Sequence, residues 1–507
     1  MDMARLNVPD RDLSSARMKV VRAAWAAKYY RSFDRDAVLR IAGAVVKAGH
    51  DKAGHFAEAA VRETGYGVVA HKTLKNQLCT FELLNHYRDL DLVSPRVDAD
   101  RKIIELPSPA GVVFALAPVT NPVATVYYKA MLAILSRNAI VLSPHPLAKT
   151  CSAEAARHLA AAAEAAGAPS GLIQCVEEPS VPLVEEIMAS DKVNVIMATG
   201  GTAMVRAAYS SGNPALGVGP GNAVAYVDPS AAVDAAARCL VDSKSFDNSI
   251  LCTNESICLT QQQNRGNMER ALRTAGAHIC SADETDRLRD YLWQDGAFNA
   301  EAIGKSAVWI AKQAGIRAND AAKILVPVVE HPGQDDLLFR EKLCPVLTLT
   351  AATDFDQAVT FAAQAAKRGA GHSAAFHGTD QRRLIAYSSA VPVNRVVVNA
   401  PCSQGAAGFA THLPPAFMIG TGFAGRSSVG ENVGPQHLVH WTRIAFGRDV
   451  PADLSALDIE ALARKPASAP VPVMAATTAS AAEPDLNRDA LRAMILEELR
   501  SLKGASE

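Results

Sequence analysis

A single cysteine, Cys252, gives the strongest chemical signal in this chain of 507 residues. It follows a polar, turn-rich approach at 245–251 (SFDNSIL) and precedes a strand-like run at 256–260 (SICLT). A thiol presented just before a strand, in a chain without a paired-cysteine motif, indicates a nucleophile. The closest of the nine cysteines, Cys258, is six residues away, a spacing that fits neither a zinc knuckle nor a redox dithiol. We therefore expect no metal site and no disulfide framework.

The composition is that of a globular enzyme with substantial cores. Of the residues, 49% are hydrophobic and 20% charged, and the length suits roughly two or three domains. Because 51 basic residues balance 52 acidic ones, we expect no nucleic-acid partner and no anionic membrane partner. The longest apolar stretch, 107–119, is interrupted by proline, serine and glycine, and it is shorter than the ~20 residues that span a bilayer.

From residue 103 onward, short apolar runs alternate with helical periods. Strands are expected at 111–117, 139–142, 172–176 and 193–197, and helices at 123–135, 153–166, 181–189 and 204–210. Strands that are apolar on both faces and alternate with helices are typical of a parallel sheet between two helix layers. The first half of the chain is therefore predicted to be a doubly wound α/β domain.

One junction between an expected strand and an expected helix could form a binding site for a pyrophosphate. It contains Thr199, Gly200, Gly201 and Thr202. Glycines allow close approach to the backbone, and free N–H groups at a helix start favour phosphate. A simple tight turn explains the motif about as well, because the spacing of the common dinucleotide fingerprint is absent. Gly217 and Gly219 do not supply that fingerprint, since Pro220 interrupts the run.

Five ordered strings give the chain a family resemblance. They are 117–122 (APVTNP), 198–201 (ATGG), 215–222 (ALGVGPGN), 246–252 (FDNSILC) and 431–437 (ENVGPQH). Together they resemble the CoA-acylating aldehyde dehydrogenases, over roughly residues 15 to 447. The resemblance implies two interlocked doubly wound α/β domains with a small oligomerisation strand pair, and a homo-oligomer. It places a cofactor-binding domain at 1–223, to which 431–455 return, and a catalytic domain at 224–430.

The resemblance implies oxidation of an aldehyde to an acyl-CoA, with NAD or NADP as hydride acceptor and CoA as co-substrate. The Cys252 thiolate would attack the aldehyde carbonyl, and donors must hold the resulting alkoxide before hydride leaves. The backbone N–H of Cys252 is one candidate donor. The side chain of Asn121 or of Thr120 is the other, and the sequence leaves that choice open.

The fate of the Cys252 thioester depends on a residue that this chain lacks. Hydrolysing aldehyde dehydrogenases carry a general-base glutamate ahead of the cysteine, in a Glu-Leu-Gly-Gly-Lys pattern. Here that place reads GVGPG at 217–221, so water is poorly activated and CoA is favoured as acyl acceptor. The alternatives are a hydrolytic aldehyde dehydrogenase, a non-catalytic scaffold of the same fold and a reductase of acyl phosphates.

Further residues receive roles from the resemblance. Glu341 matches the carboxylate that holds the nicotinamide ribose, and the other expected cofactor contacts are Pro118, Ser143, Thr199, Gly200, Gly201, Thr202, Gly217 and Gly219. The lysine that usually binds the adenosine ribose in this family is absent at 143–146 (SPHP). The preference between NAD and NADP therefore stays open. His372 and His437 stand where acylating relatives have histidine. An imidazole there could take the proton of the incoming CoA thiol or orient the thiohemiacetal, and the alternative is that each caps a turn or bonds a carbonyl. Low aromatic content, 6%, and no charged cluster indicate a small uncharged aldehyde, with a short sulfonated one left open.

The C-terminal segment has a different composition from the rest of the chain. Residues 466–484 are almost entirely Pro, Ala, Ser, Thr and Val, which is typical of a flexible linker. An amphipathic helix is expected at 485–503, with Leu491, Met494, Ile495, Leu499 and Leu502 on one face. This helix resembles the encapsulation peptides that bind shell proteins of bacterial microcompartments. We therefore expect a cytoplasmic enzyme held in a microcompartment lumen; packing against its own oligomer is the alternative.

Overall fold

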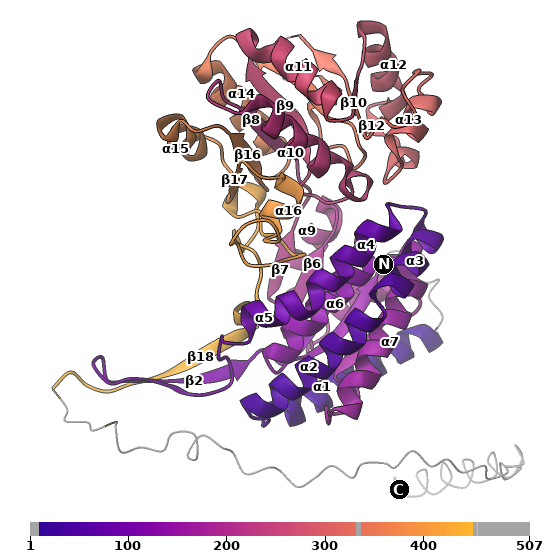
Figure 1. The fold of residues 1–507 in the computed structure, drawn as a ribbon. Coiled ribbons are helices and arrows are strands. Elements are labelled where there is room, and N and C mark those ends of the chain that lie inside the picture. The colour runs from indigo at the N-terminus through magenta and orange to yellow at the C-terminus, as the bar shows by residue number, and fades with distance from the viewer. Residues whose placement is uncertain (1–9, 331–335, 450–453, 455–507) are drawn as a thin grey trace, which may run out of the picture. The chain divides into compact units, whose positions relative to one another are not determined.

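The computed structural model describes residues 10–330, 336–449 and Leu454, and these belong to one compact unit (Figure 1). The expected linker at 466–484 and helix at 485–503 lie outside the described residues. Within the described part, none of the helices combines the length and the apolar character that crossing a membrane requires.

The first sheet has five parallel strands in the order β5-β4-β3-β6-β7. They are β3 (Val112–Ala117), β4 (Ala139–Pro144), β5 (Ile173–Cys175), β6 (Val195–Thr199) and β7 (Ala215–Val218). The linking helices are α6 (Pro122–Leu135), α7 (Lys149–Ala165), α8 (Val181–Met188) and α9 (Thr202–Ser210). Both faces of β3 and β4 are buried, which explains their continuous apolar runs. The doubly wound α/β fold is confirmed.

The N-terminal residues form five helices beside this sheet, of which α1 packs on the strands β3, β4 and β5 (Figure 1). They are α1 (Asp10–Tyr30), α2 (Arg35–Asp51), α3 (Ala53–Thr64), α4 (Val69–Gln77) and α5 (Leu83–Tyr87). Helix α2 packs on α6 and α7, and α4 packs on α3 and α6. All fourteen residues of α6 are buried because neighbours enclose it on every side, so it lacks the one-sided pattern of a surface helix.

The second sheet has six parallel strands in the order β14-β15-β9-β8-β16-β17. They are β8 (Ala223–Val227), β9 (Glu255–Gln261), β14 (Val328–Val329), β15 (Thr348–Ala352), β16 (Ala374–His377) and β17 (Val396–Val398). The helices of this half are α10 (Val233–Ser245), α11 (Arg265–Thr274), α14 (Phe355–Arg368), α15 (Gln381–Ala390) and α16 (Cys402–Ala406). Separate apolar clusters cover its two faces.

Two smaller parts complete the described fold. One consists of α12 (Ala282–Leu292), α13 (Ala307–Gln313) and the pairs β10 (Ala277–Ile279) with β13 (Ile324–Val326) and β11 (Trp293–Gln294) with β12 (Ala297–Phe298). The other is the antiparallel pair β2 (Ile103–Pro109) and β18 (Val439–Ala445), to which short β1 (Arg96–Asp98) is added. The expected strand pair is therefore present, joined by a third strand. Its part in oligomerisation, and the functional division at residue 223, remain predictions.

Candidate active site

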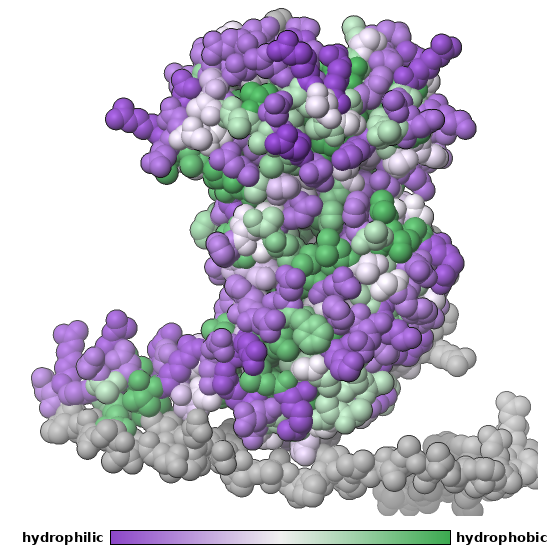
Figure 2. Space-filling view, viewed as in Figure 1, coloured by the Kyte–Doolittle hydropathy of each residue, from purple (hydrophilic) through white to green (hydrophobic). Residues whose placement is uncertain are grey.

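A cavity of about 460 Å³ lies at the carboxyl ends of β3 and β6. These strands are neighbours in the sheet, yet β3 leads through α6 to β4 on one side and β6 leads through α9 to β7 on the other. The chain order reverses between them, which is where open α/β sheets bind ligands. On the face drawn in Figure 2, hydrophilic side chains cover most of the surface, and apolar ones gather between the two sheets.

The cavity wall combines segments from both halves of the described chain. It brings together ten of the fourteen expected site residues: Cys252, Asn121, Thr120, Pro118, Ser143, Thr199, Gly200, Gly201, Gly219 and Glu341. The rest of the wall is mainly apolar and includes Val184, Ile250, Leu251, Phe417 and Ile419. The cavity can therefore hold a ligand that reaches from the β3–β6 junction to the thiol.

Two expected cofactor residues lie outside this wall. Thr202 opens α9, one residue beyond the lining glycine Gly201. The N–H of Gly217 donates to the hydroxyl of Tyr209, and a Cβ on Gly217 would lie 2.7 Å from that ring. Gly217 thus permits close packing of β7 against α9, which is a structural reason for the glycine.

The two histidines also lie outside the cavity wall. Nδ1 of His437 bonds to the backbone of Gly434 and Nε2 lies 2.8 Å from Glu431, so this imidazole holds a turn. His372 is buried, with Nδ1 2.8 Å from the hydroxyl of Ser373 and with Nε2 unpaired. Burial and the nearby Arg395 lower the pKa of His372 to about 3, so its imidazole is neutral. Catalytic roles for both remain predictions.

The cysteine follows a strained turn. Asp247, Asn248 and Ser249 all have positive φ, at 50°, 51° and 64°, a region that non-glycine residues rarely occupy. Beyond the turn, a Cβ on Gly221 would lie only 1.9 Å from the carbonyl oxygen of Cys252. Glycine at 221 is therefore required for the backbone of the 217–221 run to pass against the cysteine.

The Cys252 thiol is protonated at neutral pH. Burial and the carboxylate of Glu341 raise its pKa to about 12, against the opposing effects of Arg395 and Lys75. Burial also raises the pKa of Glu341 to about 7, although its Oε1 accepts a 3.0 Å bond from the N–H of Gly221. Attack by Cys252 therefore requires removal of the thiol proton as the substrate binds.

The β3–β6 end of the cavity fits a nicotinamide dinucleotide. The hydroxyls of Ser143 and Thr199 are buried there without a hydrogen-bond partner. Helix α9 begins after Gly201 with no side-chain cap, so its first N–H groups are free for a phosphate. These groups would hold the ribose and pyrophosphate. Glu341 lines the same cavity, and its role as a sugar ligand stays a prediction.

Sequence reasoning missed two site-forming lysines. Lys72 and Lys75 on α4 are buried and contact Asp247, and Lys75 also contacts Asn121. Lysines on a helix are normally solvated, so their sequence context gave no reason to place them inside. The one available signal was their spacing of three residues on a single helical face.

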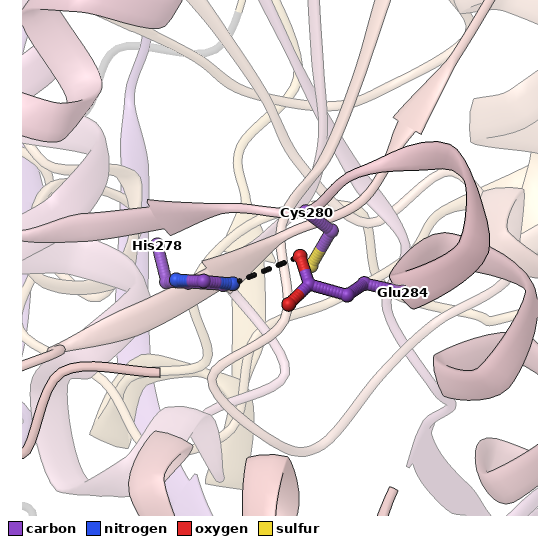
Figure 3. Close-up of side chains that lie close together, drawn as sticks. All are labelled: His278, Cys280 and Glu284. Atoms are coloured by element: carbon purple, nitrogen blue, oxygen red, sulfur yellow. Dashed lines mark hydrogen bonds and ion pairs between the residues drawn. The ribbon is translucent and has the colours of Figure 1, made fainter. Parts of the chain in front are cut away.

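A different cluster of possible metal ligands lies outside the cavity wall (Figure 3). His278 lies on β10, Cys280 follows this strand directly and Glu284 lies in the first turn of α12. Their ligand atoms are within 4.8 Å of one another. Glu284 already accepts the N–H of Ser281 in a capping box and lies 3.2 Å from Nε2 of His278. Helix capping accounts for this arrangement.

The fold and the cysteine site agree with comparisons to known proteins. Residues 7–444 match the model of the aldehyde dehydrogenase family. An aldehyde-alcohol dehydrogenase from Clostridium acetobutylicum is 34% identical over 85% of this chain and 51% of its own length. A succinate-semialdehyde dehydrogenase (acetylating) from Clostridium kluyveri is 35% identical over 84% of this chain and 94% of its own. The chain therefore belongs to the aldehyde dehydrogenase family, and it spans about half the length of the curated aldehyde-alcohol dehydrogenases that it matches.

Solved structures of aldehyde dehydrogenases have the same fold as this chain. An acetylating aldehyde dehydrogenase from Geobacillus thermoglucosidasius has a TM-score of 0.85 at 34% identity, covering 89% of this chain and 100% of its own. A propionaldehyde dehydrogenase from Rhodopseudomonas palustris, solved with bound CoA and an acylated cysteine, has a TM-score of 0.77 at 26% identity, covering 85% and 97%. Both belong to the acylating branch suggested by the sequence strings.

Replacing Gly221 with alanine should disable the site without unfolding the chain. The new Cβ would overlap the Cys252 carbonyl, so the nucleophile must move, and a shift of about 1 Å lowers turnover by on the order of 10²-fold. The matched control is Gly266→Ala on α11, where a Cβ meets nothing within 4 Å. Steady-state turnover, with circular dichroism as the folding check, tests this. Equal activity of both variants would contradict the close approach.

Proposed function

We propose that this chain is an acylating aldehyde dehydrogenase that converts a small neutral aldehyde to its acyl-CoA. The observation that carries the proposal is the cavity wall, where Cys252 faces the run 218–220 without a carboxylate from that run. A hydrolytic enzyme needs a base for water at this place. Glu341 is the one carboxylate among the described residues of the wall, and it is bonded to the N–H of Gly221.

The chemistry proceeds on the cysteine sulfur. Sγ of Cys252 forms a bond to the aldehyde carbon, and the thiol proton leaves to solvent or to a nearby base. NAD or NADP bound at the β3–β6 junction would accept the hydride that leaves the carbon of the thiohemiacetal. The thiohemiacetal thereby becomes a thioester, and the sulfur of CoA displaces Cys252 from it. Cys252 regains a proton as acyl-CoA leaves.

Two neighbouring groups support these steps. The amide of Asn121 lies in the wall with Nδ2 3.5 Å from the carbonyl oxygen of Ile250, close to the nucleophile in sequence. Thr120 contributes its hydroxyl as an acceptor for that amide, at 3.2 Å. We therefore favour Asn121 over Thr120 as the side-chain donor to the alkoxide.

Product analysis with and without CoA tests the proposed reaction. Aldehyde plus oxidised cofactor should give sustained cofactor reduction only with CoA, and the product should be the thioester. Without CoA we expect turnover to fall by on the order of 10²-fold, because water lacks a positioned base. Cys252→Ala is the control for uncatalysed chemistry. Free acid formed at the same rate in both conditions would show a hydrolytic enzyme instead.

The wall also predicts a preference for uncharged aldehydes. No lysine or arginine contributes to it within the described residues, and the imidazole of His145 has its pKa lowered by burial. A carboxylate or sulfonate beside Phe417 and Ile419 would have no counter-ion there, and an unpaired buried charge is costly.

Succinic semialdehyde and its neutral amide form a matched pair for this preference. They differ by one charge at nearly equal size, so their kcat/KM ratio reports the charge alone. We expect the amide to be preferred by on the order of 10²-fold or more, as the cost of an uncompensated charge implies. A preference for the anion would instead reveal a cation in the aldehyde path.

We also propose that the C-terminal residues target the enzyme to the shell proteins of a microcompartment. Support comes from the sequence of 485–503, whose apolar stripe follows a spacer without a core-forming composition. A homo-oligomer is proposed from the family resemblance.

Deletion of residues 466–507 tests this targeting role. The truncated chain should keep its kcat and KM, because the site is built from residues 116–419. It should lose co-purification with shell proteins that the full chain retains. Lost activity with retained shell binding would assign the segment to the enzyme body.

A further inference from the structure

A buried cluster of three charged groups lies beside the nucleophile turn. Lys72 and Lys75 on α4 are 3% and 1% exposed, and Asp247 is 0% exposed. Nζ of Lys72 lies 3.2 Å from Oδ2 of Asp247, and Lys75 donates to the same oxygen. Two ammonium groups therefore share one carboxylate, which leaves an excess positive charge in the interior. Burial and Lys75 lower the pKa of Lys72 to about 8.

The stability of the fold does not require the second positive charge. One lysine would balance Asp247, and a second buried ammonium adds a desolvation cost. What the second ammonium contacts is a site residue: Nζ of Lys75 donates to Oδ1 of Asn121 at 2.5 Å. Lys72 in turn donates to the carbonyl of Thr120 at 3.0 Å. Both acceptors belong to the segment after β3 that lines the cavity.

The contact with Lys75 determines which way the Asn121 amide faces. An ammonium group only donates, so the amide oxygen must point to Lys75 and the NH₂ group must point away. That NH₂ group has long contacts only, 3.2 Å to the hydroxyl of Thr120 and 3.5 Å to the carbonyl of Ile250. It is thus oriented but weakly engaged, as a donor reserved for a ligand oxygen must be.

The carboxylate of Asp247 is held in turn by α4 and its approach. The N–H of Val68 donates to Oδ1 at 2.7 Å, and a Cβ on Gly67 would lie 2.2 Å from that atom. Gly67 has φ +81° and fits this close approach. Since Asp247 begins the positive-φ turn before Cys252, one carboxylate connects the turn to the lysines.

We propose that Lys75 is a positioning residue for acyl transfer, which orients the Asn121 amide toward the alkoxide formed on Cys252. The inference rests on the proposed function. The charge of Lys75 also acts through space, since it lowers the pKa of Cys252 in the same direction as Arg395 and against Glu341. Removal of Lys75 leaves Lys72 and Asp247 as a balanced pair, so the fold keeps its charge compensation.

Three variants test the proposal: Lys75→Met, Asn121→Ala and the double variant. We expect Lys75→Met to fold, to lower kcat by on the order of 10²-fold and to change the aldehyde KM much less, because a transition-state donor is lost. Asn121→Ala should lose a similar factor. The double variant should lose no more than Asn121→Ala alone, because both single changes remove one interaction. Multiplied losses in the double variant, or wild-type kcat in Lys75→Met, would overturn the proposal.

The control is Lys129→Met. Lys129 on α6 is equally buried, but it donates to the carbonyls of Leu116 and Met197 and not to Asn121. It should show independent, multiplicative effects with Asn121→Ala. Should Lys75→Met fail to fold, Lys75→Leu, which also removes the ammonium group, takes its place in the same cycle.

A thiol readout separates this inference from the proposed reaction. The alkylation rate of Cys252 at one alkaline pH, followed by peptide mass spectrometry, reports the thiolate fraction. It should fall several-fold in Lys75→Met and stay near wild type in Lys75→Arg and Lys129→Met. The alkylation rates can be compared even if the wild-type protein makes no acyl-CoA. That failure would refute the proposed function but not the effect of Lys75 on the thiol. An unchanged rate in Lys75→Met would show that Lys75 does not influence the nucleophile.

Discussion

The contact between Asp247 and the two lysines of α4 is the interaction on which the site depends. It joins a helix of the N-terminal layer to the turn that presents Cys252. Three consecutive residues of that turn are in a sparsely populated backbone region, and such strain persists only where surrounding bonds hold it. Charge-assisted bonds in a dry interior are strong enough for this task. The nucleophile is therefore positioned by residues about 175 apart in sequence.

The second constraint is the passage of residues 217–221 against the cysteine. In a hydrolytic relative this region supplies a base, whereas here it contains no carboxylate, and Gly221 lies against both Cys252 and Glu341. The same glycines that allow the approach also remove the carboxylate that would activate water. The structure thus links the geometry of the nucleophile to the choice of acyl acceptor. Burial and Glu341 raise the pKa of the Cys252 thiol, so its attack on the aldehyde requires loss of the thiol proton.

Much of the fold and part of the site could be predicted from local sequence. Alternating apolar strands and helices predict a parallel sheet, and parallel strands share one carboxyl edge, where the structure brings 117–121 and 199–201 together. His437 illustrates what local sequence cannot decide, because its turn partners Gly434 and Glu431 compete with any catalytic role. His372 depends on the distant Arg395 and on burial in the same way. Lys72 and Lys75 were missed because burial of a lysine depends on a partner elsewhere in the chain.

The proposed reaction requires that Sγ of Cys252 carries the acyl group and transfers it to the thiol of CoA. Intact-protein and peptide mass spectrometry of the enzyme mixed with aldehyde and oxidised cofactor, with CoA omitted, tests it most directly. We expect an acyl mass on Cys252 that persists and then disappears when CoA is added, with acyl-CoA formed in equal amount. Cofactor reduction with position 252 unmodified, or an adduct that CoA does not discharge, would contradict it.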